Sequence, residues 1–182
     1  MGLVLGKIFG VGDIRKIGSG NIGATNALRT GNKGFAIAVL AGDALKAVIP
    51  IVIAKIYLAE AYPHAPVIAA LAALIGHVFP VWLRFKGGKG VASSAGILLT
   101  LHWPTGLCCL VMWLFCARLS RISSLSAIIA AVNLPVYAIA TGGREYALPF
   151  AVVAALVIFT HRENFKRLLK GEESTIKLKK ES

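Results

Sequence analysis

Long apolar stretches separated by short polar segments form the main pattern along this chain. A helix that crosses a membrane needs about 20 mostly apolar residues, and hydropathy combined with a helical period predicts six such spans. They cover residues 35–58, 66–85, 91–103, 104–119, 123–141 and 146–160. The third and fourth spans are short, and we expect them to form a tight helical hairpin that turns at His102, Trp103 and Pro104.

The N-terminal residues 1–10 are also apolar, but they are too few to cross a membrane. They are expected to be the end of a truncated first span or a short interfacial segment. The pattern therefore predicts an all-α, polytopic membrane helix bundle with six clear spans plus a truncated first one. With 182 residues, the chain has room for one integral-membrane domain, residues 1–182, and for no separate soluble domain.

The composition agrees with a membrane protein and limits the classes of molecule that it could bind. The chain is 57% hydrophobic and 15% charged, whereas soluble domains carry about 25% charged residues. Its 20 Lys and Arg against 8 Asp and Glu give a net charge of +12, which suits nucleic acid, anionic lipid or anionic substrates. Because the basic residues lie in short loops between spans, nucleic acid is disfavoured. Cys108, Cys109 and Cys116 lack metal-ligand spacing and are interpreted as small core residues.

The positions of the basic residues also predict the topology, because positive residues near the ends of spans face the cytoplasm. If residues 11–34 lie inside, the inner loops collect most of the Lys and Arg residues. The outer turns then hold only Lys55, Glu60, Arg144 and Glu145. The three polar segments of the chain are therefore expected on the cytoplasmic side. Lys177, Lys179 and Lys180 continue this pattern and are expected to face lipid.

The first polar segment reads G-S-G-N-I-G-A-T-N over residues 18–26 and is followed by Arg29. Its G-x-G-x-x-G spacing would indicate dinucleotide binding in a soluble βαβ unit, but no strand precedes it and that interpretation is rejected. A nest of backbone N–H groups beside hydroxyls and amides is suited to bind an anion. The planar guanidinium of Arg29 is suited to bind one as well. The alternative is an ordinary capped turn. The candidate anion-binding residues are Gly18, Ser19, Gly20, Asn21, Thr25 and Asn26.

The second polar segment is the loop K-G-G-K-G, residues 86–90, called the glycine loop below. Glycine lets the backbone approach a bound group closely and adopt positive φ, and the lysines supply positive charge. A helix that begins at Val91 points its free N–H groups toward this loop, as in phosphate sites. The alternative is a basic turn that only fixes topology. The candidate phosphate-binding residues are Lys86, Gly87, Gly88, Lys89 and Gly90.

The third polar segment, residues 161–173, predicts an amphipathic helix. His161 and Asn164 share one face with two apolar residues, whereas basic residues from Arg162 to Lys170 form a second stripe. A basic helix that lies on anionic lipid is the alternative. That alternative leaves His161 and Asn164 unexplained.

Asp43, Lys46 and His77 are ionisable residues that lie well inside predicted spans. Asp43 and Lys46 are three residues apart on one helical face. They are interpreted as a structural ion pair, because buried charges in a bilayer are costly and commonly paired. His77 lies in an apolar stretch ahead of the glycine loop and is interpreted as a packing residue with satisfied hydrogen bonds.

Taken together, G-S-G-N-I-G-A-T-N, K-G-G-K-G-V-A-S and H-R-E-N-F-K-R-L-L-K-G-E-E resemble the three signature motifs of the bacterial acyl-phosphate:glycerol-3-phosphate acyltransferases, the PlsY family. The likeness covers nearly the whole chain in order, and G-H-V-F-P-V-W ahead of the second motif is also similar. Ser93 stands where the family commonly has Thr, so the hydroxyl is kept. The resemblance implies a seven-helix, multi-pass protein of the bacterial inner membrane, with its active site facing the cytoplasm.

The resemblance also implies a reaction. A fatty acyl group moves from acyl phosphate to the 1-hydroxyl of glycerol 3-phosphate, giving lysophosphatidic acid and phosphate in the first step of bacterial phospholipid synthesis. No cofactor, metal, coenzyme A or acyl carrier protein is required. The acyl chain is expected to lie in a groove between spans, within the membrane lipid. The rival hypothesis is a transporter of phosphorylated metabolites, but transporters bind near the membrane midplane, whereas these polar groups gather at one face.

Two phosphorylated substrates require two anion sites, and the polar segments supply the residues for them. The expected catalytic residues are Ser19, Arg29, Lys89, His161 and Asn164. Lys86, Lys89 and Arg29 would stabilise charge on the leaving phosphate, while Ser19, Asn21 and Asn26 would orient phosphate or carbonyl oxygens. His161 and Asn164 would hold glycerol 3-phosphate, with Arg162 or Arg167 on its phosphate.

Two routes are open for the proton of the attacking hydroxyl. His161 acts as general base in one of them. In the other, the departing phosphate takes the proton itself, since its second pKa lies near ~6. A covalent route through Ser19 is less favoured, because no base is assigned beside that hydroxyl.

Overall fold

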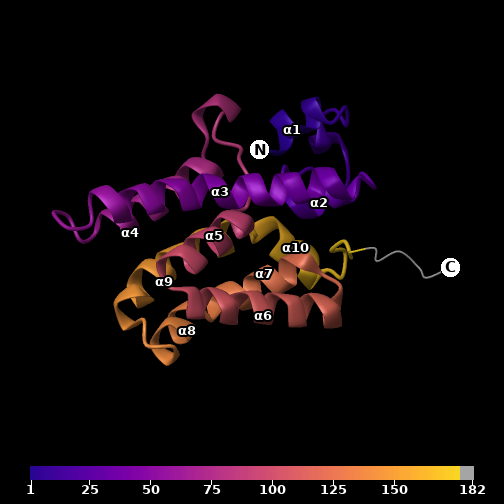
Figure 1. The fold of residues 1–182 in the computed structure, drawn as a ribbon. Coiled ribbons are helices and arrows are strands. Elements are labelled where there is room, and N and C mark those ends of the chain that lie inside the picture. The colour runs from indigo at the N-terminus through magenta and orange to yellow at the C-terminus, as the bar shows by residue number, and fades with distance from the viewer. Residues whose placement is uncertain (177–182) are drawn as a thin grey trace.

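The computed structural model describes residues 1–176, and within them the chain forms helices and no strand (Figure 1). The predicted all-α fold is therefore confirmed, whereas the prediction for Lys177, Lys179 and Lys180 lies outside the described residues. The α-helices are α1 (Gly2–Ile8), α2 (Ala24–Leu28), α3 (Lys33–Tyr57), α4 (Ala65–Val78), α5 (Val91–Leu101), α6 (Trp103–Ser120), α7 (Ser123–Val132), α8 (Leu134–Ala140), α9 (Ala147–Thr160) and α10 (Arg162–Leu169). The 3-10 helices are η1 (Ile14–Lys16), η2 (Val81–Leu83) and η3 (Arg144–Tyr146).

The described residues contain three to five helical segments that could cross a membrane by length and composition. Three meet these criteria singly: α3, α6 and the segment Ala65–Leu83, which joins α4 to η2. Two more result if each bent pair is one span: α7 with α8, bent by 49°, and Arg144–Thr160 with α10, bent by 58°. Since α5 has only 11 residues, the predicted count of six spans is not confirmed.

The breaks between helices follow from local chemistry. Proline occupies the first turn of α8, where its missing N–H is tolerated, and it prevents α7 from continuing. Only His102 separates α5 from α6, so the predicted hairpin is confirmed with its turn at that residue. Asn32 caps α3, its side chain accepting from the backbone N–H of Phe35 at 2.9 Å. These breaks place polar groups at the ends of apolar helices.

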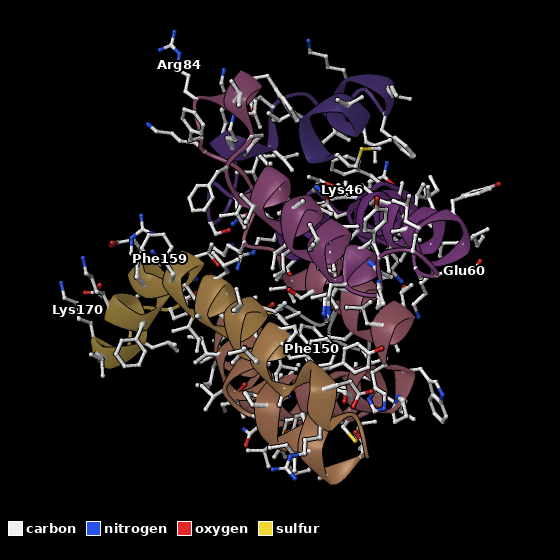
Figure 2. All side chains as sticks on the ribbon, turned by 90° about the vertical axis from the view of Figure 1, so that its left-hand side faces the viewer. Lys46, Glu60, Arg84, Phe150, Phe159 and Lys170 are labelled. Carbon is white, nitrogen blue, oxygen red and sulfur yellow. The ribbon has the colours of Figure 1, made fainter. Side chains whose placement is uncertain are left out.

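The long helix α3 connects the bundle to the first polar segment. One apolar cluster packs Ile51 of α3 against Leu74 of α4 and Phe150 of α9, and Figure 2 shows Phe150 among these helices while Arg84 extends outward. A smaller cluster packs Phe35 of α3 against residues of α1, η1 and α2. In Figure 1, α2 and α10 lie near the same end of α3. The first and third polar segments are thus brought to one end of the bundle.

The close approach of α3 and α5 depends on Gly96. A Cβ at this position would lie 2.8 Å from the carbonyl oxygen of Ala44 and 3.1 Å from a methyl group of Val48. Replacing Gly96 with Val should therefore force the helices apart and lower the free energy of unfolding by about 1–3 kcal/mol. Thermal unfolding in detergent micelles measures this loss.

Gly76 on α4 is the matched control, because a Cβ there meets nothing within 4 Å. Gly76→Ala should raise the free energy of unfolding by about 0.5–1 kcal/mol, since alanine loses less conformational freedom in a helix. Equal stability of the Gly96→Val variant and the unmodified protein would show that the two helices do not pack as described.

Candidate active site

The first polar segment folds around the side chain of Asn26, which is buried on α2. Its amide nitrogen donates to the carbonyl oxygens of Ile14 (2.8 Å) and Asn21 (2.7 Å). Its amide oxygen accepts from the backbone N–H of Ser19 (3.0 Å) and lies 3.4 Å from the Ser19 hydroxyl. Since an amide side chain offers two donors and two acceptor positions, all of them are used by Ile14, Ser19 and Asn21. Asn26 therefore shapes the segment and does not present its amide to a ligand, unlike the direct phosphate contact predicted for it.

This bonding leaves Ser19 at the exposed tip of the segment, between two glycines with positive φ. Gly18 has φ +55° and Gly20 has φ +69°, a conformation that other residues rarely adopt. A Cβ at Gly18 would also lie 2.5 Å from the Asn26 amide oxygen and 2.6 Å from the Arg29 side chain. Arg29 thus passes directly over the backbone of this loop.

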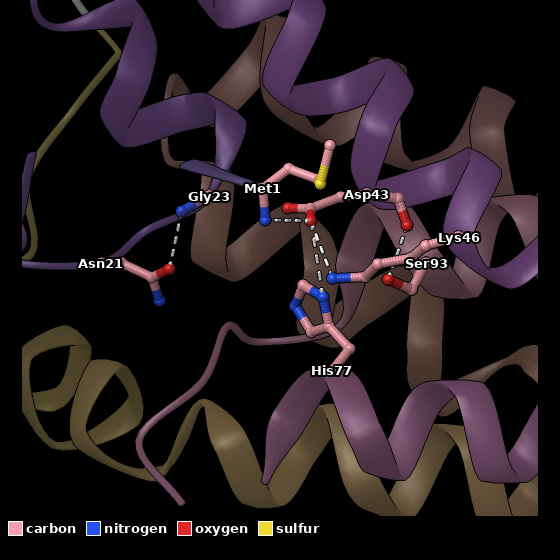
Figure 3. Close-up of polar contacts among 7 residues, drawn as sticks. All are labelled: Met1, Asn21, Gly23, Asp43, Lys46, His77 and Ser93. Atoms are coloured by element: carbon pink, nitrogen blue, oxygen red, sulfur yellow. Dashed lines mark hydrogen bonds and ion pairs between the residues drawn. The ribbon is translucent and has the colours of Figure 1, made fainter. Parts of the chain in front are cut away.

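Two further polar side chains of the segment make bonds to protein groups. The Asn21 side-chain oxygen accepts from the backbone N–H of Gly23 at 2.9 Å (Figure 3), which closes a local turn. The Thr25 hydroxyl lies 3.1 Å from the hydroxyl of Ser123, the first residue of α7. Thr25 therefore connects the first segment to the helical bundle.

The glycine loop is fastened to the C-terminal end of α4. The N–H of Gly87 donates to the Val78 carbonyl (3.0 Å), and the N–H of Gly88 donates to the His77 carbonyl (3.2 Å). A Cβ at Gly87 would lie 2.1 Å from the His77 carbonyl oxygen, and one at Gly88 would lie 2.1 Å from the His77 ring. Close approach to α4 therefore requires these glycines, whose N–H groups are engaged there, while Gly87 also lines the larger cavity described below.

The rest of the glycine loop supplies the charge. Gly90 has φ +83° and is the N-cap of α5, which begins at Val91 as predicted. Lys86 is exposed, whereas Lys89 is partly buried and reaches toward the third segment. An anion at this loop would therefore meet lysine side chains and the start of α5.

The third polar segment holds its two predicted side chains in fixed positions. His161 lies between α9 and α10, and its Nδ1 is 2.7 Å from the carbonyl oxygen of Val157. Because a carbonyl only accepts, Nδ1 carries the proton, and Nε2 of the neutral ring is an acceptor. Asn164 is 2% exposed, and its side-chain oxygen accepts from the Lys89 ammonium at 2.5 Å.

These contacts bring the three segments together, as predicted. Lys89 and Asn164 join the second and third segments, and the Thr160 hydroxyl also donates to the Lys89 carbonyl at 3.0 Å. The Arg29 guanidinium donates to the Ser174 hydroxyl at 2.6 Å, joining the first segment to the chain that follows α10. Residues 145 positions apart in the sequence thus surround one region.

Two cavities open between the segments, and Ser19 lines both of them. The larger has a volume of about 680 Å³, and its wall includes Arg15, Ser19, Asn21, Trp82, Arg84 and Lys86. The smaller has a volume of about 280 Å³ and is lined by Gly18, Ser19, Arg167, Glu172 and Ser174. Both cavities carry basic side chains, so each is suited to a negatively charged group.

Glu173 is a site residue to which sequence reasoning assigned no role. Its carboxylate accepts from Asn164 (2.7 Å), Arg167 (2.7 Å) and Ser124 (2.9 Å). Burial opposes its ionisation, but these hydrogen bonds outweigh burial and lower the pKa of Glu173 below its usual value. In the sequence, a carboxylate that follows a basic helix is only a weak indication of a site residue, because the contact of Glu173 with Asn164 depends on the fold.

The structure separates the two arginines proposed for a substrate phosphate. Arg167 lines the smaller cavity and is held by Glu173. Arg162 instead donates to the Phe159 carbonyl (3.1 Å) and stacks on the Phe159 ring, with its guanidinium carbon 4.5 Å from the ring centre. Arg162 therefore lies apart from the cluster.

The clustered side chains combine positive charge with a proton acceptor. Arg29, Lys89 and Arg167 offer positive charge beside a buried amide, and His161 offers a neutral ring nitrogen. Among residues 1–176, no group of three or more His, Cys, Asp or Glu side chains is placed to hold a metal ion. The cluster is suited to hold two anions and to accept a proton between them.

Comparison with known proteins agrees with this arrangement. The family model described as Glycerol-3-phosphate acyltransferase matches residues 1–171. A Glycerol-3-phosphate acyltransferase of Nitrobacter winogradskyi is 49% identical over 175 residues, which cover 96% of this chain and 88% of that protein. Another, of Paramagnetospirillum magneticum, is 50% identical over 182 residues, which cover 100% of this chain and 89% of that protein.

Solved structures are also similar. The crystal structure of PlsY (YgiH), an integral membrane glycerol 3-phosphate acyltransferase, in its glycerol 3-phosphate form, has a TM-score of 0.87 and 34% sequence identity. The match covers 97% of this chain and 88% of that one. The lysophosphatidic acid form of PlsY has a TM-score of 0.85 and 34% identity, with 96% and 87% covered. The similarity therefore extends over nearly the whole fold.

Proposed function

Because this chain belongs to the glycerol-3-phosphate acyltransferase family, we propose that it is a membrane enzyme that transfers a fatty acyl group from acyl phosphate to the 1-hydroxyl of glycerol 3-phosphate. The products are lysophosphatidic acid and inorganic phosphate. Acyl transfer to glycerol 3-phosphate follows from the family. The acyl phosphate donor, proposed to act without coenzyme A or acyl carrier protein, is supported by two basic cavities that suit two phosphorylated substrates.

Cavity size and lining support an assignment of the two substrates. The smaller cavity, of about 280 Å³, has room for glycerol 3-phosphate, whose phosphate would pair with Arg167 beside Asn164. The larger cavity, of about 680 Å³, combines the apolar side chains of Ile22 and Trp82 with Lys86. Its mixed lining suits the head of an acyl phosphate, with the acyl chain leaving toward lipid.

The reaction requires one bond to form and one to break. The 1-hydroxyl oxygen of glycerol 3-phosphate attacks the acyl carbonyl carbon, and the bond between that carbon and the phosphate oxygen breaks. Lys89 and Arg29 would stabilise the charge that the departing phosphate retains. The hydroxyl proton goes either to Nε2 of His161, left as an acceptor by the Nδ1 bond to Val157, or to the departing phosphate.

A His161→Gln variant distinguishes these two routes. If His161 is the base, the turnover number should fall by about 100-fold or more, because general-base catalysis contributes that much. If the departing phosphate takes the proton, turnover should stay within about tenfold of the unmodified enzyme. Steady-state rates with both substrates saturating give the answer.

One observation carries the proposal: the Lys89 ammonium of the glycine loop donates to the Asn164 amide oxygen of the third segment at 2.5 Å. A partly buried cation that joins the second and third segments is placed to act on a leaving phosphate. The distribution of Lys and Arg supports a multi-pass arrangement in the bacterial inner membrane, with six spans and the site facing the cytoplasm.

The donor is tested with purified protein, glycerol 3-phosphate and palmitoyl phosphate. Phosphate release and lysophosphatidic acid should appear in equal amounts, and only when both substrates are present. Palmitoyl-coenzyme A and palmitoyl-acyl carrier protein serve as the comparison donors. Equal or faster transfer from either thioester would overturn the proposed donor while leaving the acceptor in place.

The charge of Lys89 gives the activity a predictable pH dependence. Burial lowers the pKa of this ammonium to about 8, Glu173 opposes the shift, and Arg167 and Arg29 reinforce it. The group is charged below that pKa and neutral above it, so kcat/KM should fall about tenfold per pH unit as the pH rises above 8. A Lys89→Arg variant keeps its charge throughout and should lack this fall. A profile of kcat/KM from pH 6 to 10 measures the difference.

A further inference from the structure

An ionic cluster inside the helical bundle has no part in the chemistry above. Asp43 on α3 is 2% exposed, and its carboxylate accepts from the Lys46 ammonium at 2.8 Å, which confirms the predicted ion pair. The amino group of Met1 lies 3.3 Å from the same carboxylate oxygen (Figure 3). A third group, Nδ1 of His77 on α4, lies 3.6 Å from it. His77 is 7% exposed, so both members of this last pair are buried.

The His77 side chain connects this carboxylate to the glycine loop. Its Nδ1 faces Asp43 and has no hydrogen-bond partner within residues 1–176, so the predicted satisfied histidine is not what the structure contains. The opposite edge of the ring lies against Gly88, where an added Cβ would come within 2.1 Å of Nε2. The Gly88 N–H also donates to the His77 carbonyl. Any tilt of the ring would therefore move the backbone beside Lys89.

Asp43 also holds the far side of the same loop. Its backbone carbonyl accepts from the hydroxyl of Ser93, in the first turn of α5, at 2.8 Å (Figure 3). The loop thus contacts one residue of α3 on both sides, through the 3.6 Å approach of His77 before it and through the Ser93 hydrogen bond after it. Lys89 lies between these two attachments, with its ammonium at Asn164.

We propose that Asp43 and His77 are positioning residues, which act through the glycine loop to hold the Lys89 ammonium at the phosphate site. The inference rests on the acyltransferase function and adds two residues that contact neither substrate. Lys46 and the ion pair it forms offset part of the cost of burying the Asp43 carboxylate. The contact of Asp43 with His77 is the part that orients the loop.

The test compares kinetics of the intact enzyme carrying His77→Ala or Asp43→Asn, the second of which keeps the side-chain shape. Each should lower kcat/KM by up to about 100-fold, the cost of displacing a catalytic group by about 1 Å. The fall of kcat/KM at high pH should begin at a pH above 8, because a loosened loop exposes the Lys89 ammonium to water and so raises its pKa. Glu173, Arg167 and Arg29, the charged groups around Lys89, are unchanged in both variants.

A double substitution separates positioning from a general structural role. Because His77 acts through Lys89, adding His77→Ala to a Lys89→Met variant should lower the residual activity by less than about twofold. His102→Gln, at the α5–α6 turn, is the control and should leave both rate and pH profile unchanged. If the activity losses of His77→Ala and Lys89→Met multiply in the double variant, the proposal is overturned. It is also overturned if the single variants lower only the melting temperature and leave the pH profile unchanged. Failure of the unmodified enzyme to acylate glycerol 3-phosphate would instead overturn the function.

Discussion

Replacing Lys89 with Met should lower kcat/KM by about 100- to 1000-fold, the range found when one preorganised donor to a developing negative charge is removed. The methionine side chain keeps the length of the lysine stem, so packing against the third segment is preserved. The loss then reports the ammonium that Asn164 holds at 2.5 Å. Rates with palmitoyl phosphate and glycerol 3-phosphate, together with a melting curve in detergent, measure both properties.

Lys55 provides the matched lysine control. It lies in the last turn of α3, where its ammonium donates to the Thr100 carbonyl, and it belongs to no polar segment. The Lys55→Met variant should retain the activity of the unmodified enzyme. Near-normal activity of Lys89→Met would remove Lys89 from the mechanism.

The second large effect is expected from Asn164→Asp, which changes one atom and adds a negative charge. The new carboxylate would lie beside the Lys89 ammonium and within 2.7 Å of the Glu173 carboxylate. It would neutralise the cation, repel Glu173 and repel a substrate phosphate. Since one close charge of the wrong sign costs several kcal/mol in a site of low dielectric, kcat/KM should fall by about 1000-fold.

Asn32→Asp is the control for this amide-to-acid change. Asn32 caps the N-terminus of α3, and aspartate is an equally good cap. That variant should keep both activity and melting temperature. An Asn164→Asp enzyme with more than about a tenth of normal kcat/KM would show that the amide does not sit between cation and carboxylate as described.

Several features of the site could be predicted because they depend on neighbours in the sequence. The start of α5 at Val91 follows from the glycine before it, and the Asp43–Lys46 pair follows from a spacing of three residues on one helix. The grouping of three polar segments follows from charge placement at the ends of apolar spans. Each of these inferences needs only helix geometry and the preference of positive charge for the cytoplasmic side of a membrane.

Other features depend on contacts between distant elements and were missed. Gly87 and Gly88 are needed because the end of α4 passes against them, and nothing in the loop itself indicates that contact. Asn26 resembles a ligand contact in the sequence, but the structure shows that Ile14, Ser19 and Asn21 occupy all of its hydrogen-bonding positions. Glu173 becomes part of the site only because α10 turns it back onto Asn164. Arg162 lies away from the site while Arg167 lines a cavity, and this difference likewise depends on the stacking of Arg162 on the Phe159 ring.

The central claim is that one pocket formed by three polar segments holds both phosphorylated substrates at the same time. Initial rates measured over a grid of palmitoyl phosphate and glycerol 3-phosphate concentrations test it most directly. The account predicts double-reciprocal lines that intersect, because transfer occurs only in a complex with both substrates bound. Parallel lines, together with an acyl group found on the Ser19 hydroxyl by mass spectrometry, would contradict it.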